Sequence, residues 1–420
     1  MFKVRTLDIK KINGINDLFI GFNPGLNFIC GPNGIGKTTI LNCISSAFSR
    51  TPSPRIFPHN NTKYGEFSID MEDHLFSKSA SFYIGEHPEN MFALEEEKTI
   101  EYPHRYIDDY RGNCINFNIR SRAFEYTLQL GGEPFNFIKS WLYKNYYKDE
   151  MDIYKFYNLQ LVQECFNLLD PNISFGRITE TVITDRHPLS RYPKYRGKIG
   201  LNINSTLNDA GSRFRSKRKN VDMFVNTLHG EVLVECLSSG YKSSLTVLLG
   251  IIKGVELFSP KDLVNEFSGI IVIDEIDLHL HPQWQAKLVG AIRKLVPKAQ
   301  VICTTHSPHI IQVAKPEEVI VLGEDANGDV YVKEIPSPSE YGFQGWTIEE
   351  ILTDVMGLEQ SMSPLFLDSL EKFNVALRRG NREILMHEYK QIRKMLHPNN
   401  PLATLLSVQA GELMIWEDLK

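Results

Sequence analysis

One short segment near the N-terminus constrains the fold of this chain more than any other, because three glycines and a Lys-Thr pair stand at fixed spacing. Residues 31–38 read Gly-Pro-Asn-Gly-Ile-Gly-Lys-Thr and match the pattern G-x-x-x-x-G-K-[ST]. The apolar run 26–30 before them predicts a strand, and residues 38–48 after them predict a helix, which is the context that a phosphate-binding loop requires. Glycines let successive backbone N–H groups turn toward one anion, and the helix N-terminus adds partial positive charge.

This loop predicts a nucleotide site that takes ATP with Mg²⁺. We expect Lys37 to be an exposed loop residue that reaches the β- and γ-phosphates, and the Thr38 hydroxyl to ligate the metal. The residues expected to hold the nucleotide here are Asn33, Gly34, Ile35, Gly36, Lys37, Thr38 and Thr39.

A second motif is an apolar run that ends in two acids. Residues 270–273 are Ile-Ile-Val-Ile, typical of a buried parallel strand, and Asp274 and Glu275 follow. In phosphate-loop enzymes an Asp at this place orients Mg²⁺. Glu275 is then placed to act as the general base on the attacking water. Apolar strands often end in a solvated acid, so this motif indicates a nucleotide site only because a phosphate-binding loop lies upstream of it.

The segment Leu237-Ser-Ser-Gly-Tyr-Lys242 resembles the signature of ABC-type ATPases, although a Ser that caps a helix also reads this way. The resemblance implies that Ser238 and Gly240 cap the γ-phosphate bound by an opposite subunit. It also implies that Asp277 lies in a D-loop that contacts the partner, and that His306 is the switch histidine. The catalytic set is then Lys37, Glu275 and His306, and the metal set is Thr38 and Asp274.

A metal site of Asp274, Asp277, His279 and His281 is the rival interpretation. The glutamine loop of the family is unassigned, with Gln129 a poor choice.

The start of the chain resembles the heads of SMC-like and RecF-like ATPases, which implies an N-terminal antiparallel β-layer. The run Asp274–Pro282 with Thr304–His309 is similar to ATPases of bacterial anti-phage defence, such as OLD-type proteins and the PtuA-like subunits of Septu and retron systems. About 85 residues follow residue 335, and they read as helices without the acidic strand cluster of a Toprim nuclease. This favours a PtuA-like ATPase, which acts with a separate HNH-type nuclease.

The predicted fold class is α/β: a P-loop ABC-ATPase head with an N-terminal antiparallel β-layer, a helical insertion and a helical C-terminal tail. We expect an ATPase lobe at 1–130, the insertion at 131–227, a second ATPase lobe at 228–335 and a partner-binding region at 336–420. A hairpin is predicted over 319–335, with Asn327-Gly328 at its turn.

A basic segment within the insertion is a possible contact for DNA or RNA. Residues 186–219 hold ten Lys or Arg against one acid, Asp209, with Tyr192, Tyr195 and Phe214 interleaved. A solvated loop or a patch for an acidic protein are the alternatives. The net charge of −5 shows that any nucleic-acid surface must be local. The basic residues are Arg186, Arg191, Lys194, Arg196, Lys198, Arg213, Arg215, Lys217, Arg218 and Lys219.

The six cysteines are scattered, which fits a reducing cytoplasm rather than a disulfide or zinc scaffold. No apolar run is long enough to span a membrane, and the N-terminus lacks the apolar core of a signal peptide. The sequence thus predicts a cytoplasmic ATP-driven switch that forms head dimers around ATP and controls a nuclease subunit. A DNA-repair clamp of the RecF type and an ATPase with its own nuclease activity are the alternatives.

Overall fold

The computed structural model describes residues 3–85, 114–118, 134–182, 219–335, 339–358 and 362–411, apart from 49–52, 54, 61, 74–75, 279 and 399. The chain divides into two compact units, Met1–Met356 and Gly357–Lys420, and each is described by itself. Among the described residues, no helix is both long and apolar enough to cross a lipid bilayer.

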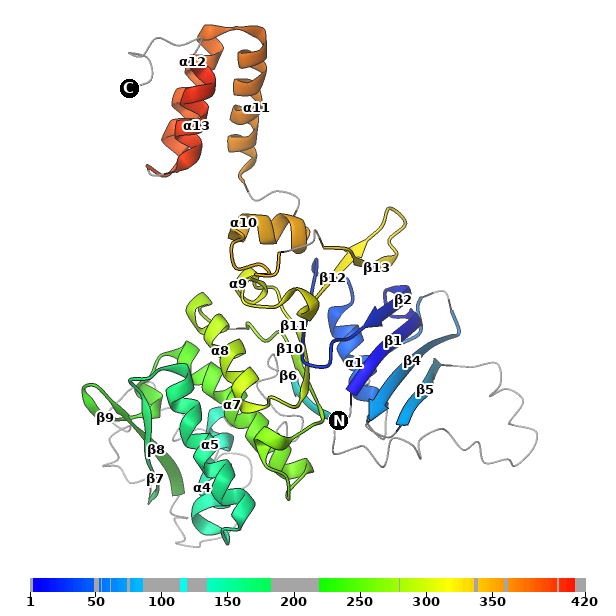
Figure 1. The fold of residues 1–420 in the computed structure, drawn as a ribbon, viewed down its shortest axis with the longest axis vertical. Helices are drawn as coiled ribbons and strands as arrows, with labels where there is room; N and C mark the ends of the chain where they lie inside the picture. Colours follow the sequence, from blue (N-terminus) through cyan, green and yellow to red (C-terminus); the bar gives the residue numbers. More distant parts are fainter. Residues whose placement is uncertain are drawn as a thin grey trace, which may run out of the picture. The chain divides into compact units, whose positions relative to one another are not determined.

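The first layer is an antiparallel sheet in the order β2-β1-β4-β5, which confirms the predicted N-terminal β-layer (Figure 1). Its strands are β1 (Lys3–Ile12), β2 (Ile15–Gly21), β4 (Tyr64–Asp73) and β5 (Phe76–Gly85). Asn13 and Gly14 join β1 to β2, and Asn13 has a φ of 50°, the left-handed backbone that a two-residue hairpin needs. Buried residues alternate with exposed ones from Leu18 to Gly21 of β2, because one face packs on the core.

The central sheet places the predicted motifs next to one another. Its order is β13-β12-β3-β11-β10-β6, parallel except for the β12–β13 hairpin. The strands are β3 (Leu26–Cys30), β6 (Cys114–Asn118), β10 (Ile270–Asp274), β11 (Gln300–Thr304), β12 (Val319–Glu324) and β13 (Val330–Lys333). Every residue of β3, β10 and β11 is buried. The hairpin confirms the prediction, and Gly328 has a φ of 84° at its turn.

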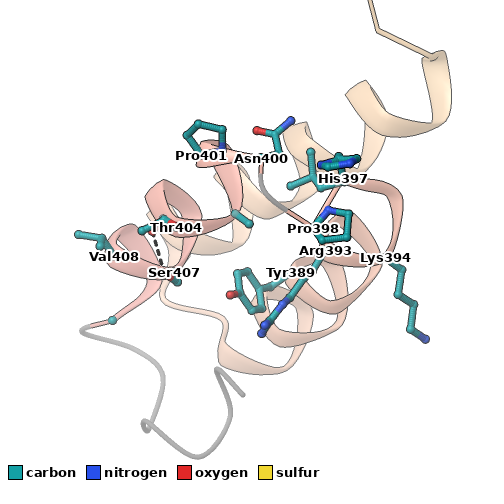
Figure 2. Close-up of a pocket in the computed structure, with 13 residues that line it drawn as sticks. Tyr389, Arg393, Lys394, His397, Pro398, Asn400, Pro401, Thr404, Ser407 and Val408 are labelled. Atoms are coloured by element: carbon teal, nitrogen blue, oxygen red, sulfur yellow. Dashed lines mark hydrogen bonds between the residues drawn. The ribbon is translucent and has the colours of Figure 1, made fainter.

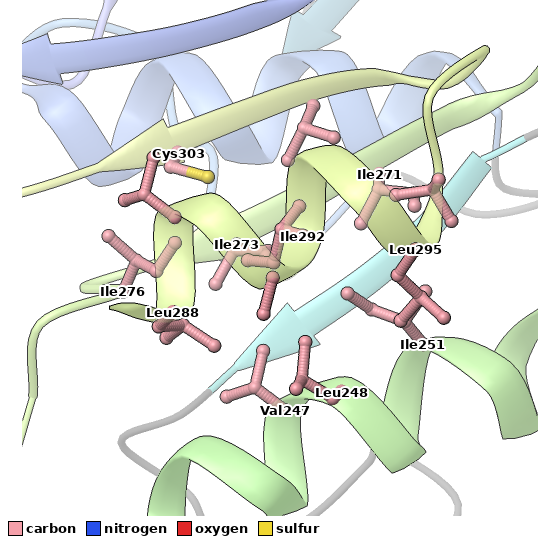
Figure 3. Close-up of a cluster of buried hydrophobic side chains, with 14 of the residues drawn as sticks. Val247, Leu248, Ile251, Ile271, Ile273, Ile276, Leu288, Ile292, Leu295 and Cys303 are labelled. Atoms are coloured by element: carbon pink, nitrogen blue, oxygen red, sulfur yellow. The ribbon is translucent and has the colours of Figure 1, made fainter. Parts of the chain in front are cut away.

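Helices and the first sheet cover the two faces of this central sheet. Ile271 and Ile273 of β10 pack into a cluster with α7 (Ser239–Phe258) and α8 (Pro282–Leu295), as Figure 3 shows. Ile270 and Val272 pack on the opposite face, with α1 (Lys37–Ala47) and the antiparallel sheet. Successive side chains of a strand point to opposite faces, so an unbroken apolar run is needed where both faces are covered.

The insertion contains more strand than the sequence predicts. It is helical over α4 (Pro134–Tyr143) and α5 (Ile153–Leu169), with a π-helical turn at Lys144–Lys148 between them. A three-stranded sheet follows, with strands β7 (Ser174–Val182), β8 (Lys219–Thr227) and β9 (Gly230–Leu233). The strands β7 and β8 were not predicted, because their pairing joins segments that are far apart in sequence.

Short elements complete the first unit: 3₁₀ turns at Val234–Cys236, Val264–Glu266 and Pro316–Glu318, then α9 (Pro308–Gln312), α10 (Ile348–Glu350) and a π-helical turn at Ile351–Val355. The second unit holds α11 (Pro364–Arg379), α12 (Arg382–Met395) and α13 (Pro401–Ala410), which confirms the predicted helical tail. Each of these three helices begins at a capping Ser or Asn, namely Ser363, Asn381 and Asn400.

The second unit has its own small core and one open pocket. Phe366, Phe373, Leu385 and Ile392 are buried among α11, α12 and α13. A pocket of about 980 Å³ lies between α12 and α13 (Figure 2). The residues around it include Tyr389, Arg393, His397, Thr404, Ser407 and Val408. All of the predicted nucleotide-site residues belong to the first unit, so none of them lines this pocket.

Candidate nucleotide site

The phosphate-binding loop has the backbone that its glycines require. Gly31 has a φ of 144°, and a Cβ there would lie 2.6 Å from the carbonyl oxygen of Leu322 in β12. Gly36 caps α1 with a φ of 104°. Residues with side chains are strained in such conformations and would also displace the neighbouring backbone. The loop therefore leads straight from β3 into the N-terminus of α1, as the sequence predicts.

Lys37 is buried, which corrects the expectation that it is an exposed loop residue. Only 6% of its surface is exposed. Its ammonium turns back over the loop and donates to the carbonyl oxygens of Gly31, at 2.9 Å, and Pro32, at 2.7 Å. Burial lowers the pKa of Lys37, while Cys30 and the carboxylates of Asp274, Glu275 and Asp277 oppose that shift. The ammonium is thus held inside the loop in the place where phosphate oxygens are expected.

Asp274 and Glu275 stand at the carboxyl end of β10, beside the loop. The Thr38 hydroxyl lies 3.3 Å from each carboxylate oxygen of Asp274. The Thr304 hydroxyl, at the end of β11, donates to Asp274 Oδ1 at 2.6 Å and accepts from the Glu275 N–H at 2.7 Å. Glu275 has a φ of 53°, a strained conformation for a residue with a side chain. This turn holds both acids at the edge of the sheet, where they are 6% and 8% exposed.

Asp277, the residue predicted for the D-loop, contacts the segment after β11. Its Oδ1 accepts from the Thr305 hydroxyl at 2.7 Å and from the backbone N–H of His306 at 3.2 Å. His306 is half-buried at this position. Asp277 therefore holds Thr305 through its hydroxyl and His306 through its backbone, the two residues that follow β11.

A second link between these segments runs through Gln285 of α8. Its amide donates to the Leu280 carbonyl at 3.0 Å and its carbonyl oxygen accepts from the Ser307 hydroxyl at 2.5 Å. His281 Nδ1 accepts from the Gln283 N–H at 3.4 Å and caps α8. His279, the other histidine of the rival metal interpretation, lies outside the described residues.

Ser238 caps the N-terminus of α7 and accepts from the Tyr241 N–H at 3.2 Å. Gly240 lies against Trp284, and a Cβ there would be 2.7 Å from the Trp284 ring. Ser238 itself is exposed. No described hydrogen bond joins Ser238 to Lys37, Thr38 or Asp274 of its own chain. Ser238 is thus exposed at the N-terminus of α7, where the helix supplies partial positive charge.

The side chains at this edge suit a nucleotide bound with Mg²⁺. A hydroxyl from Thr38 and a carboxylate from Asp274 are the hard oxygen ligands that Mg²⁺ prefers, and they face each other. The Lys37 ammonium and the α1 N-terminus supply the opposite charge for phosphates. The strand order β3-β11-β10 explains the convergence, because parallel strands end at one edge of the sheet.

Sequence reasoning missed Thr304 and Thr305, which contact the acids, and Gln285, which joins Leu280 to Ser307. Thr304 ends β11 and Thr305 follows it, and the adjacency of β11 to β10 was the available signal. Two other predicted features lie outside the described residues: Gln129, and the basic segment 186–219 apart from the backbone at its last residue.

Comparison with known proteins places the chain in a family. A family described as "AAA domain, putative AbiEii toxin, Type IV TA system" matches residues 113–312, and an "AAA domain" family matches residues 6–101. The Septu protein PtuA of Bacillus thuringiensis is 33% identical over 98% of this chain and 98% of its own length. The Retron Vc95 probable ATPase of Vibrio cholerae serotype O1 biovar El Tor is 25% identical over 92% of this chain and 85% of its own.

Two solved SMC head structures are also similar. One is an SMC head bound to the C-winged helix domain of ScpA, 15% identical, with a TM-score of 0.44 over 79% of this chain and 97% of that chain. The other is an SMC head domain from Thermotoga maritima, 12% identical, with a TM-score of 0.43 over 80% of this chain and 100% of that chain. The extent of the PtuA match, together with the loop, signature, acids and histidine in their expected order, shows that the chain belongs to the PtuA family of ABC-type ATPases.

Proposed function

We propose that this chain binds and hydrolyses ATP between two copies of itself, and that this cycle controls a separate nuclease subunit in anti-phage defence. The observation that carries the proposal is the edge of the central sheet where Lys37, Thr38, Asp274 and Glu275 meet. ATP with Mg²⁺ supplies the phosphoanhydride and the metal charge. The chain's own groups bind the phosphates, orient the attacking water and accept its proton.

Each side chain has a distinct role in this proposal. Lys37 and the loop N–H groups neutralise the β- and γ-phosphates. Thr38 and Asp274 hold Mg²⁺, and the carboxylate of Glu275 accepts a proton from the water. His306 contacts the γ-phosphate, and Asp277 fixes the position of the histidine backbone at 3.2 Å.

The position of the signature supports the proposed dimer. Ser238 is exposed at the start of a twenty-residue helix, and its described bond is to its own helix. We infer that Ser238, the Gly240 N–H and the α7 N-terminus cap a γ-phosphate on a second copy. ATP then lies between two copies, and hydrolysis loosens them.

The test of the dimer mixes two inactive variants, Lys37→Ala and Ser238→Arg. If the signature acts on the second copy, each mixed dimer keeps one site with an intact loop and an intact signature. ATPase activity should therefore return in the mixture. Normal hydrolysis by Ser238→Arg alone would show that this segment is not a signature.

Control of a nuclease is proposed from the relative named Septu protein PtuA. We infer a separate HNH-type nuclease as partner, with the C-terminal helices α11–α13 as its docking region. Co-expression of tagged chain with the product of an adjacent HNH nuclease gene should recover both proteins together. A chain with residues 357–420 removed should lose that partner and keep ATP binding.

A further inference from the structure

The signature segment is held from two sides by the helices of the insertion. Glu235 stands three residues before Ser238, in the 3₁₀ turn Val234–Cys236. Its carboxylate forms an ion pair with Lys139 of α4, and Lys139 is only 2% exposed. On the other side, the Tyr241 hydroxyl donates to the Phe166 carbonyl of α5 at 3.0 Å.

The contacts around Glu235 fix the backbone that leads into the signature. Lys242, in the first turns of α7, donates to the Glu235 carbonyl at 3.0 Å. Tyr241 is 1% exposed and packs edge-on against Trp284, with ring centroids 5.4 Å apart. Ser238 therefore lies between Glu235, whose carboxylate pairs with Lys139, and the buried ring of Tyr241. Movement of α4 or α5 would disturb one of these two contacts, because Lys139 and Tyr241 are both buried and closely packed.

The Lys139–Glu235 pair is poorly suited to a purely stabilising role. Burying two charges costs solvation, and apolar side chains of similar size often do as well. The second carboxylate oxygen of Glu235 is buried and has no hydrogen-bond partner in the described structure. Such a pair serves best to fix one geometry, because loss of either partner leaves an uncompensated charge beside the signature.

We propose that Lys139 is a positioning residue for the signature: through Glu235 it sets where Ser238 and the α7 N-terminus meet the ATP held by a second copy. This rests on the proposed head dimer. The role differs from that of the nucleotide-binding residues, because Lys139 touches no part of its own chain's loop in any described contact. Loss of Lys139 should impair hydrolysis at the site that its signature completes on the partner copy. ATP binding by the loop of the same chain, which contains Lys37, should be spared.

The experiment uses mixed dimers of the full chain. Lys139→Met should bind ATP normally by calorimetry and lose hydrolysis by about tenfold or more. Mixed with Lys37→Ala, it should recover about a quarter of the wild-type rate, because half the dimers are mixed and each keeps one intact site. Mixed with Ser238→Arg, it should recover nothing, since both lesions damage the same half of the site.

Three controls separate this proposal from simpler explanations. Lys148→Met removes another insertion lysine, whose 3.1 Å pair with Glu180 is solvent-exposed, and should leave hydrolysis unchanged. Exchange of charges in Lys139→Glu with Glu235→Lys should restore the rate, because it restores the ion pair, while normal ATP binding by Lys139→Met excludes a folding defect. Glu235→Gln breaks the same ion pair from the other partner. It should likewise recover hydrolysis when mixed with Lys37→Ala and not when mixed with Ser238→Arg.

The outcomes are distinct. Recovery of Lys139→Met with Ser238→Arg, or no recovery with Lys37→Ala, would overturn the role of Lys139. If the pair Lys37→Ala and Ser238→Arg fails to recover, the head dimer itself is wrong, and the role of Lys139 falls with it. If Lys148→Met loses as much ATPase activity as Lys139→Met, the insertion is sensitive to substitution in general, and this result would also overturn the proposal.

Discussion

The hydroxyl of Thr304 donates a 2.6 Å hydrogen bond to Asp274 across two neighbouring parallel strands. The same oxygen accepts the N–H of Glu275 at 2.7 Å, so one side chain contacts both Asp274 and Glu275. Its position at the end of β11 lets it bridge the turn after β10.

Replacement of Thr304 by Val should therefore misplace both acids while keeping the shape of the side chain. A buried N–H and a carboxylate oxygen lose their partner, which should cost about 1–3 kcal/mol of stability. Hydrolysis should fall and the Mg²⁺ concentration for half-maximal rate should rise. Thr304→Ser, which keeps the hydroxyl, is the matched control. If Thr304→Val and the wild type have equal hydrolysis rates and equal Mg²⁺ dependence, this role of Thr304 is contradicted.

Replacement of Lys37 by Ala should abolish ATP binding in a chain that remains folded. The variant also leaves the Gly31 and Pro32 carbonyls without their charged donor, at a cost of about 1.5–3 kcal/mol. Calorimetry with ATP and thermal denaturation without it measure the two effects. ATP affinity equal to wild type would remove Lys37 from the site.

Glu275→Gln should trap ATP and stabilise the head dimer. Gln keeps the shape and an acceptor oxygen, but it cannot take a proton from water at neutral pH. Sedimentation velocity should show a dimer with ATP and Mg²⁺ and a monomer without nucleotide. An unchanged hydrolysis rate in this variant would count decisively against Glu275 as the base.

ATP binding should take up protons at alkaline pH. In the free chain, burial lowers the pKa of Lys37 below its ordinary value of 10.5. The charges of bound phosphates favour the protonated ammonium, so they raise that pKa again. Affinity should then fall as pH rises through the pKa of the free chain. Calorimetry in two buffers of different ionisation enthalpy measures the uptake, and Lys37→Arg should abolish it.

The basic segment should make DNA binding salt-sensitive if it follows a phosphate backbone. Replacing Arg213, Arg215, Lys217, Arg218 and Lys219 with Ser should weaken binding at all sequences alike, because phosphate contacts carry little base information. The log–log salt slope should fall by about 0.9 for each phosphate of duplex DNA that the variant no longer neutralises. Fluorescence anisotropy across a salt series measures it. Loss of a partner protein in a pull-down, with an unchanged slope, would assign this segment to protein binding instead.

The nucleotide-site motifs were predictable because each lies in one short stretch with strong local meaning. The loop at 31–38 needs glycines for its backbone, and the run 270–273 needs apolar residues because the strand is buried on both faces. Such constraints act between neighbours in sequence. The order of loop, signature, acids and histidine could thus be read without knowing the fold.

Tertiary structure alone decided which side chains support these motifs. Thr304 holds Asp274, Gln285 joins Leu280 to Ser307, and Lys139 reaches Glu235 from 96 residues away. It also decided that Lys37 is buried, and that β7 pairs with β8. These contacts depend on which strands and helices become neighbours when the core closes, and no local pattern encodes that, because the free energy that selects them comes from burial of the whole sheet.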